Sequence, residues 1–163
     1  MQADRDSTRL DAQRIFEELA RHEVNFVLVG GLAAQTHGNT RMTNDVDVIP
    51  EPDPANLGRL ASALNALNAR VLNPGSEGVD IDAAMLPRAT IWQFATPHGD
   101  IDVLHDAPGA APFEGLRDRA LVIALGDVQV PVAGRDDLIR MKLARGRPVD
   151  RADVAALTDP EVD

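Results

Sequence analysis

Two periods of apolar and polar positions alternate along the chain, and each predicts a different kind of element. Apolar residues recur every three or four positions over residues 7–22, 54–69 and 135–145, which predicts amphipathic helices. Shorter apolar runs and strict alternation predict strands over residues 25–29, 45–49, 71–72, 89–95, 100–104, 121–125 and 128–132. Short helices are expected over residues 32–37 and 113–119, and a last helix from Pro148 to about residue 157. Residues 79–88 fit neither period.

Turn residues between these elements indicate which strands pair. The residues Pro97-His98-Gly99 and Gly126-Asp127 each separate two alternating segments, so two hairpins are expected. The chain of 163 residues has no internal repeat and no long linker, which fits one domain.

Composition excludes several kinds of chemistry. The chain has no cysteine, so thiolate catalysis, disulfides and cysteine-ligated zinc are ruled out. Its first residues are too charged for a signal peptide, and no apolar run approaches the roughly 20 residues that span a bilayer. We therefore predict a soluble cytoplasmic protein with no membrane partner.

The net charge of −10 argues against broad nonspecific binding to nucleic acid. It leaves room for a local basic face, for which the chain offers arginines 135, 140, 145, 147 and 151.

Aspartates on two predicted strands are the clearest candidates for chemistry. Asp45 and Asp47 are two positions apart on a strand, so both side chains leave the same face while Val46 and Val48 face the core. Asp102 repeats the arrangement on a later strand. If the two strands are neighbours, three carboxylates converge and suit a hard divalent cation. The alternative is that the aspartates are ordinary exposed positions of half-solvated strands.

Two further features point to a phosphate. Gly30-Gly31 follows an apolar strand and opens a helix, where backbone N–H groups can meet an anion, although many strands simply end in glycine. Arg41 and Thr43 lie just before the acidic pair, and the arginine fits either a phosphate contact or a solvated loop. Neither a P-loop nor a dinucleotide-binding motif is present.

These motifs together resemble a known family. Gly30-Gly31, then Arg41-x-Thr43-x-Asp45-x-Asp47, then Asp102 within Gly-Asp-Ile-Asp-Val, resemble the nucleotidyltransferase fold of the polymerase-beta superfamily. The run from Asp137 to Ala144 and the following Gly146-Arg147-x-x-Asp150-x-x-Asp153 are similar to small bacterial nucleotidyltransferases of the AbiEii and MenT toxin type. The match covers roughly residues 24–50, 99–105 and 131–157.

The resemblance implies the architecture. It implies an α/β (α+β) nucleotidyltransferase fold, with a mixed β-sheet flanked by helices and a helical C-terminal extension. We expect a single domain over residues 1–163, with a catalytic core at about 24–105 and a C-terminal hairpin and helices at about 113–160.

The resemblance also implies roles for individual residues. The carboxylates of Asp45, Asp47 and Asp102 would be catalytic and would bind two Mg²⁺ or Mn²⁺ ions, and Asp102 would help to deprotonate the attacking hydroxyl. The groups that would bind the nucleotide are Gly30, Gly31, Arg41, Thr43 and the sole lysine, Lys142. The residues Arg147, Asp150 and Asp153 would either support the last two helices through ion pairs or line the site. Many relatives carry Gly-Ser where this chain has Gly30-Gly31, so backbone donors would replace the serine hydroxyl here.

The implied activity is transfer of a nucleoside monophosphate from a nucleoside triphosphate (NTP) to an acceptor hydroxyl, the reaction of EC class 2.7.7. The acceptor stays open between an RNA or tRNA 3′ end, a protein and a small molecule such as an antibiotic. A toxin-type role would add a cognate antitoxin protein as a partner. A catalytically degenerate member that binds a nucleotide or a partner without turnover is the other reading. A glycosyltransferase fits less well, because such enzymes usually need a larger nucleotide-sugar domain than this short chain offers. A haloacid-dehalogenase-type phosphatase fits less well, because its aspartates end an apolar strand, whereas Asp45 follows a polar segment.

Overall fold

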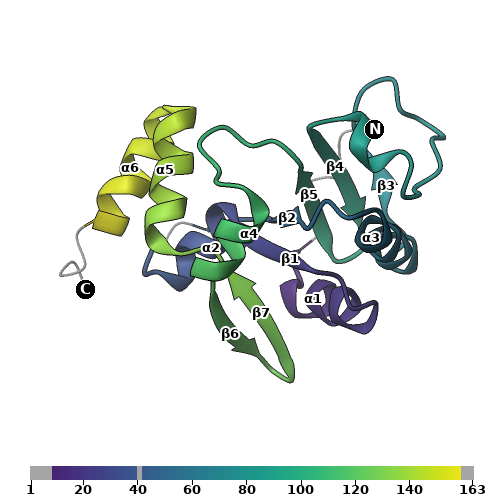
Figure 1. Cartoon of the computed structure of the whole chain (residues 1–163), viewed down its shortest axis with the longest axis horizontal. Coiled ribbons are helices and arrows are strands. Elements are labelled where there is room, and N and C mark those ends of the chain that lie inside the picture. Colours follow the sequence, from purple (N-terminus) through teal and green to yellow (C-terminus); the bar gives the residue numbers. More distant parts are fainter. Residues whose placement is uncertain (1–8, 40–41, 159–163) are drawn as a thin grey trace.

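The residues that the structure describes are arranged around one mixed sheet of seven strands, in the order β3-β4-β5-β2-β1-β7-β6. The computed structural model describes residues 9–39 and 42–158 (Figure 1). The strands are β1 (Phe26–Val29), β2 (Asp45–Pro50), β3 (Arg70–Val71), β4 (Ile91–Thr96), β5 (Gly99–Leu104), β6 (Leu121–Leu125) and β7 (Val128–Val132). Within the sheet, β2 runs parallel to β5 and β1 parallel to β7, and the other neighbours are antiparallel.

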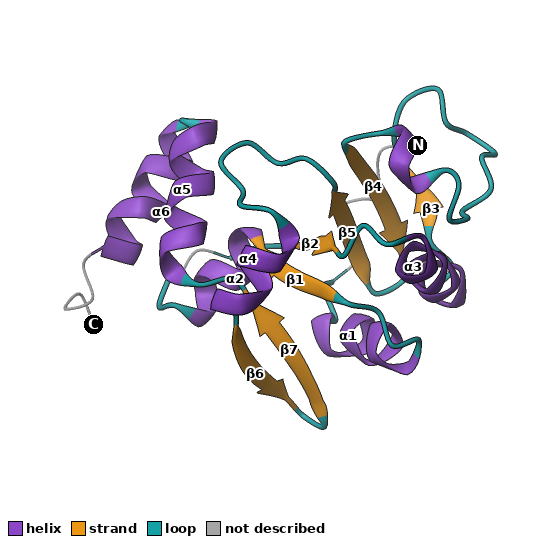
Figure 2. Ribbon diagram, viewed as in Figure 1, coloured by secondary structure: helices purple, strands orange, loops and turns teal. Residues whose placement is uncertain are grey.

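In the described part of the chain, six α-helices flank this sheet (Figure 2). They are α1 (Ala12–Arg21), α2 (Gly30–Thr36), α3 (Pro54–Ala66), α4 (Phe113–Arg119), α5 (Arg135–Arg145) and α6 (Pro148–Thr158), and a short 3₁₀ helix covers Leu86–Arg88. Helix α2 packs on β1 and β2, and α5 packs against both α2 and α6. Helices α5 and α6 stand at one end of the molecule, with α2 next to them (Figure 1).

The alternation of apolar residues on the central strands determines which face is buried. Val46 and Val48 on β2, and Ile101 and Val103 on β5, are fully buried. The aspartates between them lie on the opposite, partly exposed face. The predicted orientation of these two strands is thus confirmed.

Each strand expected from the sequence is present within one or two residues of the predicted bounds, and both hairpins form. The expected α/β (α+β) class with a mixed sheet and C-terminal helices is confirmed.

Helix boundaries were predicted less well than strand boundaries. The first helix begins at Ala12 instead of residue 7, because the side chain of Asp11 caps it by accepting a hydrogen bond from the Arg14 N–H at 3.2 Å. The second begins at Gly30 instead of residue 32, so the two glycines form its first turn. The third ends at Ala66 instead of residue 69, shortly before Asn68 takes a left-handed φ of 54°.

Within the described residues, no helix is long and apolar enough to cross a membrane.

Candidate active site

Strands β2 and β5 bring the predicted aspartates together. In their parallel ladder Asp45 pairs with Asp100, and Asp47 pairs with Asp102. Four carboxylates therefore lie on one face of two neighbouring strands. The expectation that these two strands are neighbours is confirmed, and the local cause is the alternation that buries the valines behind the acids.

The Asp47 and Asp102 side chains are hydrogen-bonded to each other, and this bond requires a proton on one of them. Burial raises the pKa of Asp47 to about 7, with the charges of Asp102 and Asp45 adding to the shift and the Arg145 guanidinium opposing it. Burial also raises the pKa of Asp102 to about 6, reinforced by the Asp45 charge, while hydrogen bonds from Asp47 and Gln93 hold it down. Asp47 is thus the proton donor and Asp102 the acceptor. Two such close carboxylates repel each other when both are charged, unless a cation lies beside them.

Gly30 sits directly under the Asp47 carboxylate. A Cβ atom at this position would overlap the Asp47 side chain, including its Cγ at 2.8 Å. The residue also has a φ of +75°, which L side chains rarely adopt. Glycine at this position therefore allows the first turn of α2 to approach the acids.

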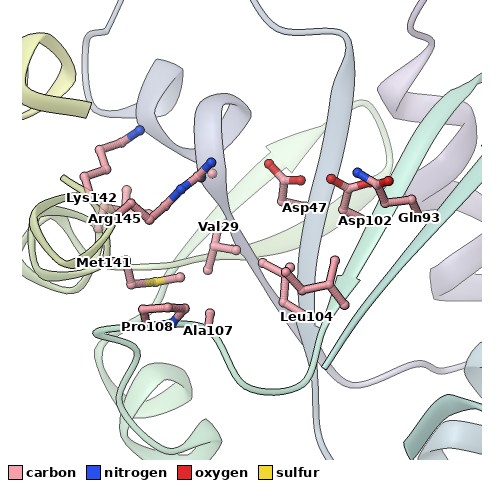
Figure 3. Close-up of a pocket in the computed structure, with 13 residues that line it drawn as sticks. Val29, Asp47, Gln93, Asp102, Leu104, Ala107, Pro108, Met141, Lys142 and Arg145 are labelled. Atoms are coloured by element: carbon pink, nitrogen blue, oxygen red, sulfur yellow. The ribbon is translucent and has the colours of Figure 1, made fainter. Parts of the chain in front are cut away.

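A cavity of about 350 Å³ opens between the acids and α5 (Figure 3). Asp47, Asp102 and Gln93 form one side, and Arg145 lies on the other. The rest of the lining is mostly apolar and comes from β1, β4, β5, the following loop and α5: Val29, Ile91, Leu104, Ala107, Pro108, Leu138 and Met141. Gly30 and Lys142 complete the lining. A volume of this order suits one small ligand or part of a larger one.

Two polar residues of the cavity wall, Gln93 and Arg145, were not among the site residues predicted from the sequence. Gln93 pairs with Asp102 across the β4–β5 hairpin, so the register of the predicted turn could have identified it. Arg145 was considered only as part of a basic face. Its place beside the cavity depends on how α5 packs against α2, which no local pattern reports.

Lys142 lines the cavity, but its ammonium group is engaged elsewhere. It donates to Asp153 of α6 at 2.8 Å, and both side chains are buried. The Asn39 amide donates to the other Asp153 oxygen at 3.0 Å. This buried network ties the end of α2 to α5 and α6.

Arg147 and Asp150 form a second ion pair at the α5–α6 junction. The guanidinium donates twice to the buried Asp150 carboxylate, at 2.8 and 3.1 Å. Asp150 holds the pKa of Arg147 above its usual value, and Arg147 holds the pKa of Asp150 below its own. Neither residue nor Asp153 lines the cavity, so their contacts match the supporting role among the two alternatives.

The remaining predicted residues contribute less directly. The Thr43 hydroxyl accepts a hydrogen bond from the Asp45 N–H at 3.4 Å, which supports the start of β2. Asp45, Gly31 and Thr43 are not among the residues lining the cavity. Arg41 lies outside the described residues.

The donor set was compared with the needs of a divalent cation. Among the side chains of residues 9–39 and 42–158, no three His, Cys, Asp or Glu groups already surround a single point as a metal site would. The chemistry nevertheless fits, because adjacent buried carboxylates that must share a proton offer hard oxygen ligands and lack positive charge. The fit therefore rests on ligand type and electrostatics.

Comparison with known proteins identifies a family for this chain. The family model described as "Nucleotidyltransferase of unknown function (DUF6036)" matches residues 9–158. No curated protein shows significant sequence similarity to the chain.

Three solved structures have a similar fold. The lincosamide antibiotic adenylyltransferase LnuA, in its lincomycin-bound form, is 14% identical with a TM-score of 0.60, over 93% of this chain and 99% of that one. A nucleotidyltransferase from Thermotoga maritima, named as putative, is 14% identical with a TM-score of 0.57, over 88% and 86% of the two chains. The antibiotic-resistance factor ANT(2″)-Ia is 16% identical with a TM-score of 0.57, over 90% and 78%. At these identities the likeness establishes a shared fold.

Proposed function

Because the chain belongs to the nucleotidyltransferase family DUF6036, we propose that it transfers a nucleoside monophosphate from an NTP to an acceptor hydroxyl and releases pyrophosphate. One observation supports this most strongly. The parallel register of β2 and β5 sets Asp47 beside Asp102 at the wall of a cavity, with Gly30 underneath and Arg145 opposite. A strand register that places buried acids together costs stability, so it is best explained by a role in the reaction.

The residues of the chain have distinct roles in this proposal. The backbone at Gly30 admits the triphosphate close to the acids, since no side chain blocks the approach. Arg145 stabilises negative charge on the phosphates as it is redistributed during transfer. Asp102, held in place by the hydrogen bond from Gln93, receives the proton of the attacking hydroxyl.

Asp45, Asp47 and Asp102 are the proposed ligands for divalent cations. Mg²⁺ or Mn²⁺ bound there would neutralise the carboxylates and stabilise charge on the transferring phosphate. With the cations present, Asp47 loses the proton that it otherwise holds near neutral pH.

We favour a small molecule as the acceptor. The cavity wall between β5 and α5 is aliphatic, with no aromatic side chain among the residues that line it. Recognition of single-stranded nucleic acid commonly uses aromatic rings on which bases stack. LnuA and ANT(2″)-Ia are named for antibiotics, which supports the same choice.

An RNA 3′ end is the second candidate acceptor. Arg135, Arg140 and Arg145 on α5 and Arg151 on α6 are exposed in an otherwise acidic chain, and Arg145 also lines the cavity. The AbiEii and MenT type, a toxin role and a cognate antitoxin remain predictions linked to this second candidate.

One experiment separates these acceptors. The protein is incubated with each α-³²P-labelled NTP and Mg²⁺, with either total tRNA or a panel of hydroxylated small molecules that includes lincosamides and aminoglycosides. Arg145→Gln serves as a site variant and Arg59→Gln, on α3 away from the cavity, as its matched control. We expect label on a small molecule, loss of at least about tenfold with Arg145→Gln, and no loss with Arg59→Gln. Label on tRNA alone would replace the favoured acceptor, and label on neither would favour the degenerate reading.

A further inference from the structure

Strand β6 forms an apolar outer edge of the sheet. Its sequence is Leu-Val-Ile-Ala-Leu, and the Leu121 and Val122 side chains are 53% and 64% exposed. Edge strands are usually protected from pairing with other strands by charged residues, by proline or by being very short. The opposite edge, β3, has two residues, one of which is Arg70. Strand β6 has five residues and none of these protections, although it stands at the outside of the molecule (Figure 2).

The hairpin register identifies the backbone groups that face outward from this edge. Leu125 and Val128 close a two-residue turn, so they exchange hydrogen bonds, as do Ile123 and Val130. The intervening residues Val122 and Ala124 direct their N–H and C=O groups away from β7. Val122 lies opposite Pro131, which has no N–H to offer, and this agrees with the assignment. Four backbone groups on β6 are therefore oriented to pair with a further strand.

We propose that two copies of this chain associate through antiparallel pairing of their β6 strands, around a two-fold axis at Ile123. In this register Val122 of each copy lies opposite Ala124 of the other. Each of these two pairs exchanges two backbone hydrogen bonds, so all four outward-facing groups of each strand are satisfied. The two sheets become one continuous sheet.

A second copy fits this edge better than an unrelated strand would. The two-fold register places Leu121 opposite Leu125, so apolar side chains meet along the strand. The same register sets the exposed turn residue Asp127 of one copy opposite Arg119 of the other, whose guanidinium also pairs with Asp137 of its own chain. The edge is thus complementary to itself in hydrophobicity and in the positions of its outward-facing backbone groups. This proposal does not depend on the proposed enzymatic function, because β6 contributes no residue to the cavity.

The first test measures mass in solution. Multi-angle light scattering after gel filtration should give twice 17.5 kDa for the unmodified chain. Ala124→Pro removes an outward N–H without removing a bond to β7, because this residue lies in a non-hydrogen-bonded pair of the hairpin. It should weaken dimerisation by at least about tenfold. Ala124→Ser keeps the N–H and should remain dimeric. A monomer at every concentration of the unmodified chain would overturn the proposal.

The second test uses the absence of cysteine in the chain. At the two-fold axis Ile123 faces its own copy in a non-hydrogen-bonded pair, where Cα atoms are about 4.5 Å apart, which is within reach of a disulfide. Ile123→Cys should form a disulfide-linked dimer under mild oxidation. The control is Leu143→Cys, which is 57% exposed on helix α5 and is not part of the β6 edge, and it should stay monomeric on a denaturing gel. Equal cross-linking of both variants, or none for folded Ile123→Cys, would exclude this register.

Discussion

At the scale of single residues, the central feature is the proton that Asp47 and Asp102 share. In the folded chain the pKa of Asp47 is raised to about 7, whereas an aspartate in the unfolded chain has a pKa near 3.8. Between these pH values the folded state binds more protons than the unfolded state. The free energy of unfolding from this pair must therefore fall as pH rises from about 4 to about 7.

Replacing Asp47 with asparagine should consequently stabilise the metal-free protein. The amide still donates a hydrogen bond to Asp102, but it carries no proton that can be lost. We expect the Tm at pH 8 to rise by roughly 2–4 °C, the shift expected for about 1 kcal/mol in a chain of this length. The gain should shrink as pH falls toward 4. Thermal unfolding in EDTA at several pH values measures it, and a lower Tm at pH 8 would contradict the shared-proton description.

Gly30 provides a second prediction at this scale. Gly30→Ala introduces a methyl group that overlaps the Asp47 carboxylate and also strains a backbone with a φ of +75°. Gly78→Ala is a matched control, because Gly78 has a φ of +77° and nothing within 4 Å of the added Cβ. Both variants should lose about 1 kcal/mol of stability from the backbone. Only Gly30→Ala should lose nucleotidyl transfer, by at least about tenfold; equal activity of the two variants would exclude the close approach as a requirement.

The sequence predicted the acids and the glycines but only part of their surroundings. Asp45, Asp47 and Asp102 were identified because strand alternation is a local property. Arg145 was not assigned to the site because its position depends on packing between α5 and α2. Lys142 lines the cavity, but nothing in the sequence indicates that the buried Asp153 pairs with its ammonium group.

At the scale of elements, the contacts between α5 and α6 help to position the side of the cavity that α5 forms. Lys142 and Asp153 form a buried ion pair between these two helices, and Asn39 links the same carboxylate to the segment after α2. A buried charge that loses its partner is costly, whereas a neutral pair of similar shape is not.

Lys142→Met should therefore destabilise the chain by about 3–5 kcal/mol. The double variant Lys142→Met/Asp153→Asn should recover most of this loss, because the remaining amide can still accept a hydrogen bond from Asn39. Arg140→Met, on the same helix but 57% exposed, should change stability by less than about 0.5 kcal/mol. Urea unfolding compares the three. If the double variant were no more stable than Lys142→Met, the ion pair would not explain the effect.

Strands were easier to predict than helix ends. Alternating acids and valines specified β2 and β5 closely, and turn residues gave both hairpins. The start of α1 was missed because Asp11 caps the helix although the apolar pattern extends further back. The start of α2 was missed because Gly30 and Gly31 look like a loop until the packing against Asp47 is known.

At the scale of the whole molecule, the order of the short sequence motifs predicts the fold. The same motifs do not identify the acceptor substrate. The family and the similar solved structures establish a nucleotidyltransferase fold, as the sequence resemblance implied. The division into a catalytic core and a C-terminal extension stays a prediction, as does the cytoplasmic location. The choice of acceptor depends on a cavity whose walls come from β1, β4, β5, a loop and α5, which only the assembled structure brings together.

The central claim is transfer of the α-phosphoryl group at the Asp47–Asp102 site. The most direct measurement uses two parallel incubations for each NTP, with Mg²⁺ and the acceptor substrate. In one the NTP is labelled on the α-phosphate, and in the other on the γ-phosphate. Asp102→Asn, which retains shape and hydrogen bonding but cannot accept the proton, serves as the matched variant. The account predicts that the α label joins the acceptor, that the γ label leaves as pyrophosphate, and that Asp102→Asn abolishes both. Transfer of the γ label, or undiminished transfer by folded Asp102→Asn, would contradict it.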